Sequence, residues 1–265
     1  MTNEAYHSRS EISKSSIDLF MKSPYHYKHR DELRKESKAF ELGSAVHTLV
    51  LEPHKFESEY IVQKIDKRTV AGRELVREAM EKRKTILSPE DYEIALEMSK
   101  SVLSSKVGKL LGGGIAEASY FSEIDGIGVR CRPDYYNEDL GIIIDLKTTV
   151  DASPSEFAKS CGKFNYHIQD AFYTDVMNSL GKKVSTFLFI GVEKTAPYMV
   201  GAYVLSDVDK DLGREQYKKV IEKIKICEAN NDFGEKEYFS IDATTGAKDY
   251  VQTIVLPNYV HYKEI

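Results

Sequence analysis

Three charged side chains near the middle of the chain have the types and spacing for chemistry at a phosphate ester. They lie in the segment RCRPDYYNEDLGIIIDLKTT, residues 130–149, where Asp145 and Lys147 follow a run of isoleucines. Side chains alternate between the two faces of a strand, so Asp145 and Lys147 share one face. Asp134 comes earlier in the same segment. If residues 127–133 and 141–148 pair as a hairpin, we expect Asp134 and Asp145 to converge at its edge.

Two carboxylates and an ammonium group in this arrangement suit a bound divalent cation. Mg²⁺ prefers oxygen ligands, which Asp134 and Asp145 supply. The Lys147 ammonium is a compact positive charge that can hold or help deprotonate a water and stabilise phosphate charge. The pattern therefore indicates metal-assisted phosphodiester hydrolysis. An acid-x-lysine pair on a strand is also common as a plain solvated pair, so the surrounding sequence must distinguish the two interpretations.

A helical segment after this strand carries two further polar side chains. FNYHIQDAFYTDVM places Gln169 and Tyr173 four residues apart, which puts both on one helix face. Next to a metal site, these two groups can orient a phosphate or a base. Taken without the preceding strand, they equally fit a partly exposed helix face.

The N-terminal part that must support these residues is predicted to be mainly helical over residues 1–114. Residues 38–51, KAFELGSAVHTLVL, predict a strongly apolar helix that carries His47. Ser88 followed by Pro89 and two acids predicts another helix start, and this helix runs towards residue 106. The glycines at 112–114 end the helical region.

Residues 115–206 predict a sheet core. Three strands joined by hairpins are expected first, with a turn at Asp125-Gly126, then a helix over 154–180 and two further strands. Residues 207–265 predict a C-terminal helix and a tail. We therefore expect a single domain over 1–265 of the α/β class, with a central mixed sheet flanked by helices and a helical N-terminal lobe.

Composition excludes several classes of protein. The net charge is −5, which argues mildly against a simple DNA-coating protein but not against an enzyme with a local basic channel. The three cysteines contain no CxxC pair, so a zinc or iron–sulfur site is not expected, and they suit a reducing compartment. No apolar segment approaches the length of a membrane span. We expect a soluble cytoplasmic protein.

Several motifs in order resemble the PD-(D/E)xK nuclease superfamily. RPDYY, IIDLKTT and YHIQDAFYTD look like its core motifs and, more narrowly, like those of RecE-type (exonuclease VIII-like) phage exonucleases, which are related to the RecB nuclease domain. ISKSSIDLFMKSPYHYKH is similar to the opening helix of that group, and FELGSAVHTLVLEP is similar to its histidine-bearing helix. The resemblance runs from about residue 6 to about residue 205 and implies a restriction-endonuclease-like core.

The resemblance implies a set of metal ligands. Asp134 and Asp145 match metal-binding carboxylates, and His47 matches a metal-site histidine. The Leu146 backbone carbonyl is implied as a further ligand. Glu117, at the start of the first expected strand, matches an acid found in related nucleases.

The remaining roles concern catalysis and DNA. Lys147 matches the catalytic lysine, and Gln169 and Tyr173 match the helix motif that contacts the scissile region of the DNA. KRTVAGRE resembles a basic motif of the RecE-like branch. Its surroundings contain three arginines that we expect to approach the DNA backbone, although they also fit a solvated helix face: Arg68, Arg73 and Arg77.

The implied activity is that of a Mg²⁺- or Mn²⁺-dependent exodeoxyribonuclease that degrades linear double-stranded DNA from 5′ to 3′ in phage-type recombination. The resemblance also implies a homo-oligomeric ring and a single-strand annealing protein as partner. A positively lined channel would let an acidic chain hold DNA through phosphate contacts. Two alternatives stay open: a structure-specific or single-strand endonuclease on the same fold, and a non-catalytic DNA-binding module.

Overall fold

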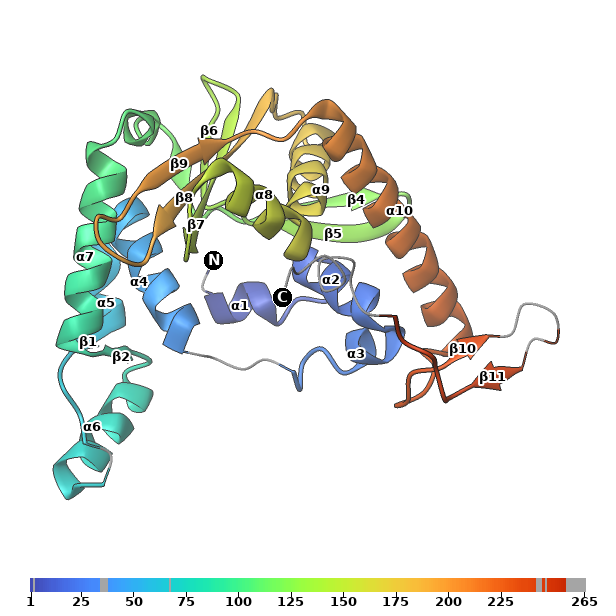
Figure 1. Ribbon diagram of the computed structural model, residues 1–265, viewed down its shortest axis with the longest axis horizontal. Coiled ribbons are helices and arrows are strands. Elements are labelled where there is room, and N and C mark those ends of the chain that lie inside the picture. Colours follow the sequence, from blue (N-terminus) through green and yellow to red (C-terminus); the bar gives the residue numbers. More distant parts are fainter. Residues whose placement is uncertain (2, 34–37, 67, 242–244, 246, 256–265) are drawn as a thin grey trace, which may run out of the picture.

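A five-stranded sheet between two groups of helices forms the centre of the protein, as the computed structural model shows (Figure 1). The structure describes the whole chain except residues 2, 34–37, 67, 242–244, 246 and 256–265. The strand order is β3-β6-β7-β8-β9. The strands are β3 (Ile115–Ala116), β6 (Tyr135–Asn137), β7 (Ile142–Thr149), β8 (Thr186–Glu193) and β9 (Val200–Tyr203).

The sheet is mixed, as the sequence predicted. β7 pairs antiparallel with β6 and parallel with β8, and β8 pairs antiparallel with β9. A parallel pair needs a long crossover, which is supplied here by α8 (Pro154–Lys163) and α9 (Tyr166–Ser179). The apolar run at the start of β7 is buried because helices cover both faces of the sheet.

Alternation along β7 assigns its side chains to two different cores. Ile144 and Leu146 pack in one cluster with residues of α4 (Lys38–Leu51) and α7 (Pro89–Ser104). Ile143 packs in the other cluster, with residues of α9 and α10 (Asp207–Asn230) and of α2 (Lys14–Lys22). Asp145 and Lys147 therefore lie on the face of the sheet that α9 covers.

The sequence misjudged how the strands before β7 pair. The expected hairpin between 127–133 and 141–148 does not form. Instead, β4 (Tyr120–Ile124) and β5 (Ile127–Cys131) make a separate two-stranded sheet, and β6 pairs with β7. Pro133 explains the break because it has no N–H to continue a strand ladder. The turn at Asp125-Gly126 is confirmed, and both residues have positive φ, as a tight hairpin turn requires.

Two other expectations are refined. The helix expected over 154–180 is divided into α8 and α9, and Asn165 between them has a φ of 55°. The helix expected to begin at Ser88 is confirmed as α7, since the Ser88 hydroxyl caps it by accepting a hydrogen bond from Asp91 N at 3.0 Å.

The remaining elements lie around this core. Among the described residues, no helix is both long enough and apolar enough to cross a membrane. The peripheral elements are α1 (Asn3–His7), α3 (Pro24–Lys28), the 3₁₀ turn η1 (Pro53–Lys55), α5 (Phe56–Glu59), β1 (Tyr60–Val62), α6 (Val70–Glu81), β2 (Thr85–Leu87), η2 (Val107–Leu110), β10 (Ser240–Ile241) and β11 (Lys248–Asp249).

Candidate metal centre

Three residues from separate parts of the chain meet beside the central strand β7. His47 comes from α4, Glu117 follows β3, and Asp134 directly precedes β6. One ligand atom of each lies within 4.8 Å of the others, and His47 Nδ1 is 3.4 Å from Asp134 Oδ2. All three side chains are half-buried, so a small ion can reach them from solvent. Residues that lie far apart in the sequence thus form one compact group of ligands.

Backbone hydrogen bonds fix the two acids of this group. Asp134 Oδ2 accepts a hydrogen bond from Leu146 N at 2.8 Å, which ties the carboxylate to β7. Glu117 N donates to the Asp134 carbonyl at 3.0 Å. The sequence suggested that Glu117 starts a strand. Instead, it follows the end of β3 and has a φ of 51°. This left-handed conformation is uncommon for glutamate, and the hydrogen bond to Asp134 holds it.

Asp145 and Lys147 lie next to this group, on the α9 side of the sheet. The Asp145 side chain is only 1% exposed, and Lys147 Nζ lies 2.5 Å from its Oδ2. Gln169 Nε2, from α9, donates a hydrogen bond to the other oxygen of Asp145. The sequence expectation that these three residues share one neighbourhood therefore agrees with the observed geometry.

The carboxyl groups of the site outnumber the positive charges beside them, and burial together with this imbalance raises the pKa of two of them. Burial, and then the nearby Asp134 carboxylate, raises the pKa of Glu117 to about 8. Burial also raises the pKa of Asp145 to about 6, an increase that Lys147 opposes and Asp134 reinforces. Carboxylates held this close repel one another, so a bound cation would relieve a cost that the folded chain otherwise carries.

The donor set fits a divalent metal ion. One imidazole nitrogen and two carboxylates form the group, and oxygen-rich sets favour hard ions over thiophilic ones. Asp145 Oδ2 is a buried oxygen whose charge is balanced by the Lys147 ammonium at 2.5 Å. His47, Glu117 and Asp134 are therefore the residues that would hold the ion, with Asp145 adjacent.

Two aromatic side chains of α9 border this site. Lys147 Nζ lies 4.9 Å from the centre of the ring of Tyr166, a residue that the sequence offered as a neighbour of the site without fixing its position. Tyr166 lies three residues before Gln169 on the same helix, so helical periodicity could have indicated that position. Tyr173 lies deeper, where its ring packs edge-on to Phe187 at 6.2 Å and burial raises its pKa well above the ordinary value.

The three arginines predicted to approach DNA do not join the site. They lie on or just before α6, which projects from the edge of the molecule well away from β7 (Figure 1). Each arginine contacts residues that are close to it in the sequence. Arg68 pairs with Asp66, and Arg73 donates a hydrogen bond to the Arg68 carbonyl. Arg77 lies 3.8 Å from Glu81. Their approach to DNA stays a prediction about a separate surface.

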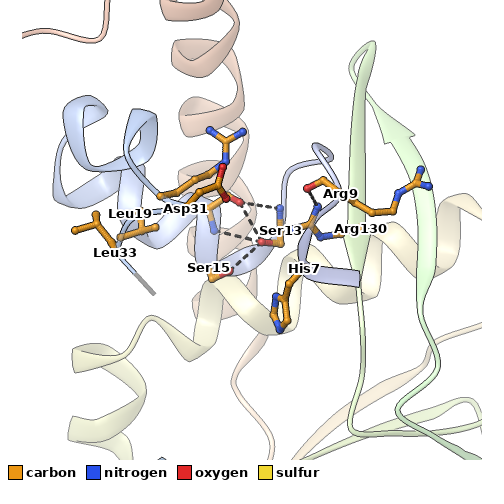
Figure 2. Close-up of a pocket in the computed structure, with 10 residues that line it drawn as sticks. His7, Arg9, Ser13, Ser15, Leu19, Asp31, Leu33 and Arg130 are labelled. Carbon is orange, nitrogen blue, oxygen red and sulfur yellow. Dashed lines mark hydrogen bonds between the residues drawn. The ribbon is translucent and has the colours of Figure 1, made fainter. Parts of the chain in front are cut away.

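A small polar cavity of about 110 Å³ lies at the N-terminus of α2 (Figure 2). Its arginines already make contacts within the chain, since Arg9 pairs with Glu11 and Arg130 donates to the Arg9 carbonyl. None of the site residues predicted from sequence is among the described residues that line it, which are His7, Arg9, Ser13, Ser15, Ser16, Leu19, Arg30, Asp31, Leu33 and Arg130.

The mixed sheet, the helices on both faces and the acid cluster beside the central strand β7 define a protein of the PDDEXK-like class. The chain belongs to the family described as a PDDEXK-like domain of unknown function (DUF3799), whose model matches residues 13–237. That match spans α2 to the end of α10 and contains every residue of the candidate site.

One solved structure supports the fold assignment. A candidate exonuclease from Eubacterium rectale is similar at a TM-score of 0.60 and 15% identity, over 93% of this chain and 99% of that one. A phage-related exonuclease from Haemophilus somnus 129PT is similar at a TM-score of 0.35 and 14% identity, over 71% of this chain and 94% of that one. The comparison with curated proteins found no match.

Proposed function

We propose that this protein is a metal-dependent exodeoxyribonuclease that acts on linear double-stranded DNA. The observation that carries the proposal is the convergence of His47, Glu117 and Asp134 within 4.8 Å of one another, directly beside the ion pair of the buried Asp145 and the half-buried Lys147. A metal-dependent nuclease of the PDDEXK class needs such a cluster, because phosphodiester hydrolysis places negative charge at the reacting phosphate.

His47, Glu117 and Asp134 would hold the ion, with Mg²⁺ or Mn²⁺ as the expected metal. The Leu146 carbonyl stays a predicted further ligand, and Leu146 N already positions Asp134. A bound divalent ion supplies Lewis acidity and a more acidic water. The chain itself contributes the orientation of the acids, since the half-buried Asp134 is tied to β7 and Glu117 N donates to its backbone carbonyl.

Lys147 would act as a fixed positive charge towards the scissile phosphate. Burial lowers the pKa of Lys147, but Asp145 and Asp134 beside it raise the pKa more, and the net value lies above the ordinary one. The ammonium therefore keeps its proton near neutral pH. Gln169 holds Asp145 from the other side, so the pair keeps one orientation on the rigid strand.

The finer features of the proposal come from the sequence resemblance. They are 5′ to 3′ polarity, action in phage-type recombination with an annealing protein, and a homo-oligomeric ring. The name of the Eubacterium rectale protein agrees with exonuclease chemistry, although at 15% identity its structure supports the fold alone. A ring would gather the positive charge that DNA binding needs into one channel.

Digestion of three DNA forms tests the proposal. Linear, nicked and covalently closed duplexes of the same sequence are incubated with the protein and Mg²⁺, with EDTA as the matched control. Metal-dependent loss of linear DNA alone is expected. Cutting of closed circles would instead indicate an endonuclease, and binding without cleavage in any metal would indicate a non-catalytic module.

A further inference from the structure

An exposed aromatic residue projects from the junction between α8 and α9. Phe164 is 48% exposed, and it lies between the last residue of α8 and Asn165. Single exposed apolar residues are ordinary on protein surfaces and need no special explanation. Phe164 differs because of what its ring, its backbone and its neighbours contact.

The Phe164 ring is the outer member of a short aromatic stack that leads to the candidate site. It stacks on Tyr166 at 5.8 Å between ring centres, with 26° between the planes. Tyr166 in turn stacks on the buried Phe189 at 5.5 Å. The Lys147 ammonium lies over the same Tyr166 ring. The exposed ring and the proposed phosphate-facing charge are thus separated by one side chain.

The backbone of this junction is held from several directions. Phe164 N donates to the Ser160 carbonyl at 2.9 Å, and Lys14 Nζ donates to the Phe164 carbonyl at 2.8 Å. The side-chain amide of Asn165 donates to Asp18 Oδ1 at 3.2 Å, which supports its left-handed backbone. These contacts join the junction to α2, so the ring is presented with little freedom left to lose on binding.

Positive charge accompanies the exposed ring. The ammonium of Lys163, an exposed residue, lies 5.3 Å from the centre of the Phe164 ring. Aromatic faces combined with lysine or arginine are the recurring equipment for single-stranded nucleic acid, because every base offers a face for stacking and every nucleotide brings a phosphate. A buried apolar partner would not need the charge, and a free phosphate would not need the ring.

We propose that Phe164, supported by Tyr166, is a stacking platform for an unpaired base of the strand being cut. The ligand class is a nucleobase at a frayed or single-stranded DNA end, held while its phosphate lies near Lys147. This inference rests on the proposed nuclease function and adds the requirement that the duplex end opens at the site. Phe164 is then a positioning residue that selects melted ends.

Fluorescence of a terminal 2-aminopurine tests the platform without cleavage. Duplexes with a mismatched, frayed end carry the probe on the last nucleotide of either strand, and the full-length protein is added in EDTA. The wild-type chain should quench the probe on one strand. Phe164→Ala should abolish this quenching and bind the frayed end about tenfold more weakly, while Phe164→Trp should restore both.

Tyr238→Ala is the matched control, since Tyr238 is another exposed aromatic residue, 62% exposed, and lies near β10. It should quench as the wild type does. Equal quenching by Phe164→Ala, or none by the wild type, would overturn the platform. Cleavage of the same DNA by the wild type with Mg²⁺ is scored separately. If the wild-type protein cuts the DNA but does not quench the probe, only the stacking platform is contradicted. If it quenches the probe but does not cut the DNA, the nuclease proposal is contradicted.

Discussion

Replacing Lys147 with methionine should leave a proton on Asp145 near neutral pH. Methionine keeps most of the volume of the lysine stem but removes the ammonium that lies 2.5 Å from Asp145 Oδ2. The carboxylate is 1% exposed, so water cannot replace that charge. Gln169 would remain as its hydrogen-bond donor, on the other oxygen.

The size of the effect follows from the burial of the pair. Removing one partner of a buried ion pair costs about 3–5 kcal/mol, which is about two to four pKa units at roughly 1.36 kcal/mol per unit. The pKa of Asp145, about 6 in the intact site, would then exceed about 8. At pH 7.5 most Asp145 side chains would carry a proton, and a Mg²⁺ ion held beside them by His47, Glu117 and Asp134 would favour the loss of that proton.

Calorimetric titration with Mg²⁺ in two buffers of different ionisation enthalpy counts that proton. Lys147→Met should release about 0.7 to 1 more proton per ion bound at pH 7.5 than the wild type. The double variant Asp145→Asn/Lys147→Met is the control, and the extra proton should vanish there. Cleavage by Lys147→Met should fall at least about 100-fold, while DNA binding in EDTA should persist.

Two results would refute this reasoning. Equal proton release by Lys147→Met and the wild type would mean that Lys147 does not keep Asp145 ionised. Full cleavage by Lys147→Met would remove the lysine from the proposed chemistry.

Three further changes test other parts of the molecule. Burial raises the pKa of Asp170 to about 7, so the folded state keeps a proton that the unfolded chain loses above about pH 4. The free energy of unfolding should therefore fall by up to about 4 kcal/mol as pH rises from 4 towards 8. Urea unfolding of Asp170→Asn should show a weaker dependence of this free energy on pH. A wild-type protein whose stability does not change with pH would contradict this. In Gly213→Ala the new Cβ would lie 2.2 Å from the His167 carbonyl oxygen. Thermal unfolding should therefore show that the free energy of unfolding falls by about 1–3 kcal/mol. An unchanged Tm would exclude tight packing of α10 on α9. Arg73→Ala should weaken DNA binding and reduce its salt dependence by about one phosphate contact, whereas an unchanged slope would leave α6 outside the DNA interface.

The elements with strong local signals were predictable from the sequence. The apolar run before Asp145 predicted β7, and alternation correctly placed Asp145 and Lys147 on one face. Ser88 and Pro89 predicted the start of α7 because capping is a local interaction. The mixed sheet between helices followed from the order of these elements.

Strand pairing was less accessible because it depends on residues far apart in the chain. The sequence paired 127–133 with β7, although Pro133 already marked the point where one strand had to end. The left-handed backbone of Glu117 is also set from a distance, by the Asp134 carbonyl. No local pattern identifies a glutamate in that conformation, so its position beside His47 could come only from the resemblance.

End-labelled DNA offers the most direct test of the central claim. A linear duplex labelled on either the 5′ or the 3′ end of one strand is incubated with the protein, with and without Mg²⁺, and the products are resolved by size. The account predicts that the protein releases the 5′ label early, as a very short product, only when Mg²⁺ is added. The 3′-labelled strand should then shorten progressively. Both labels staying in full-length strands, at all Mg²⁺ and Mn²⁺ concentrations, would contradict it.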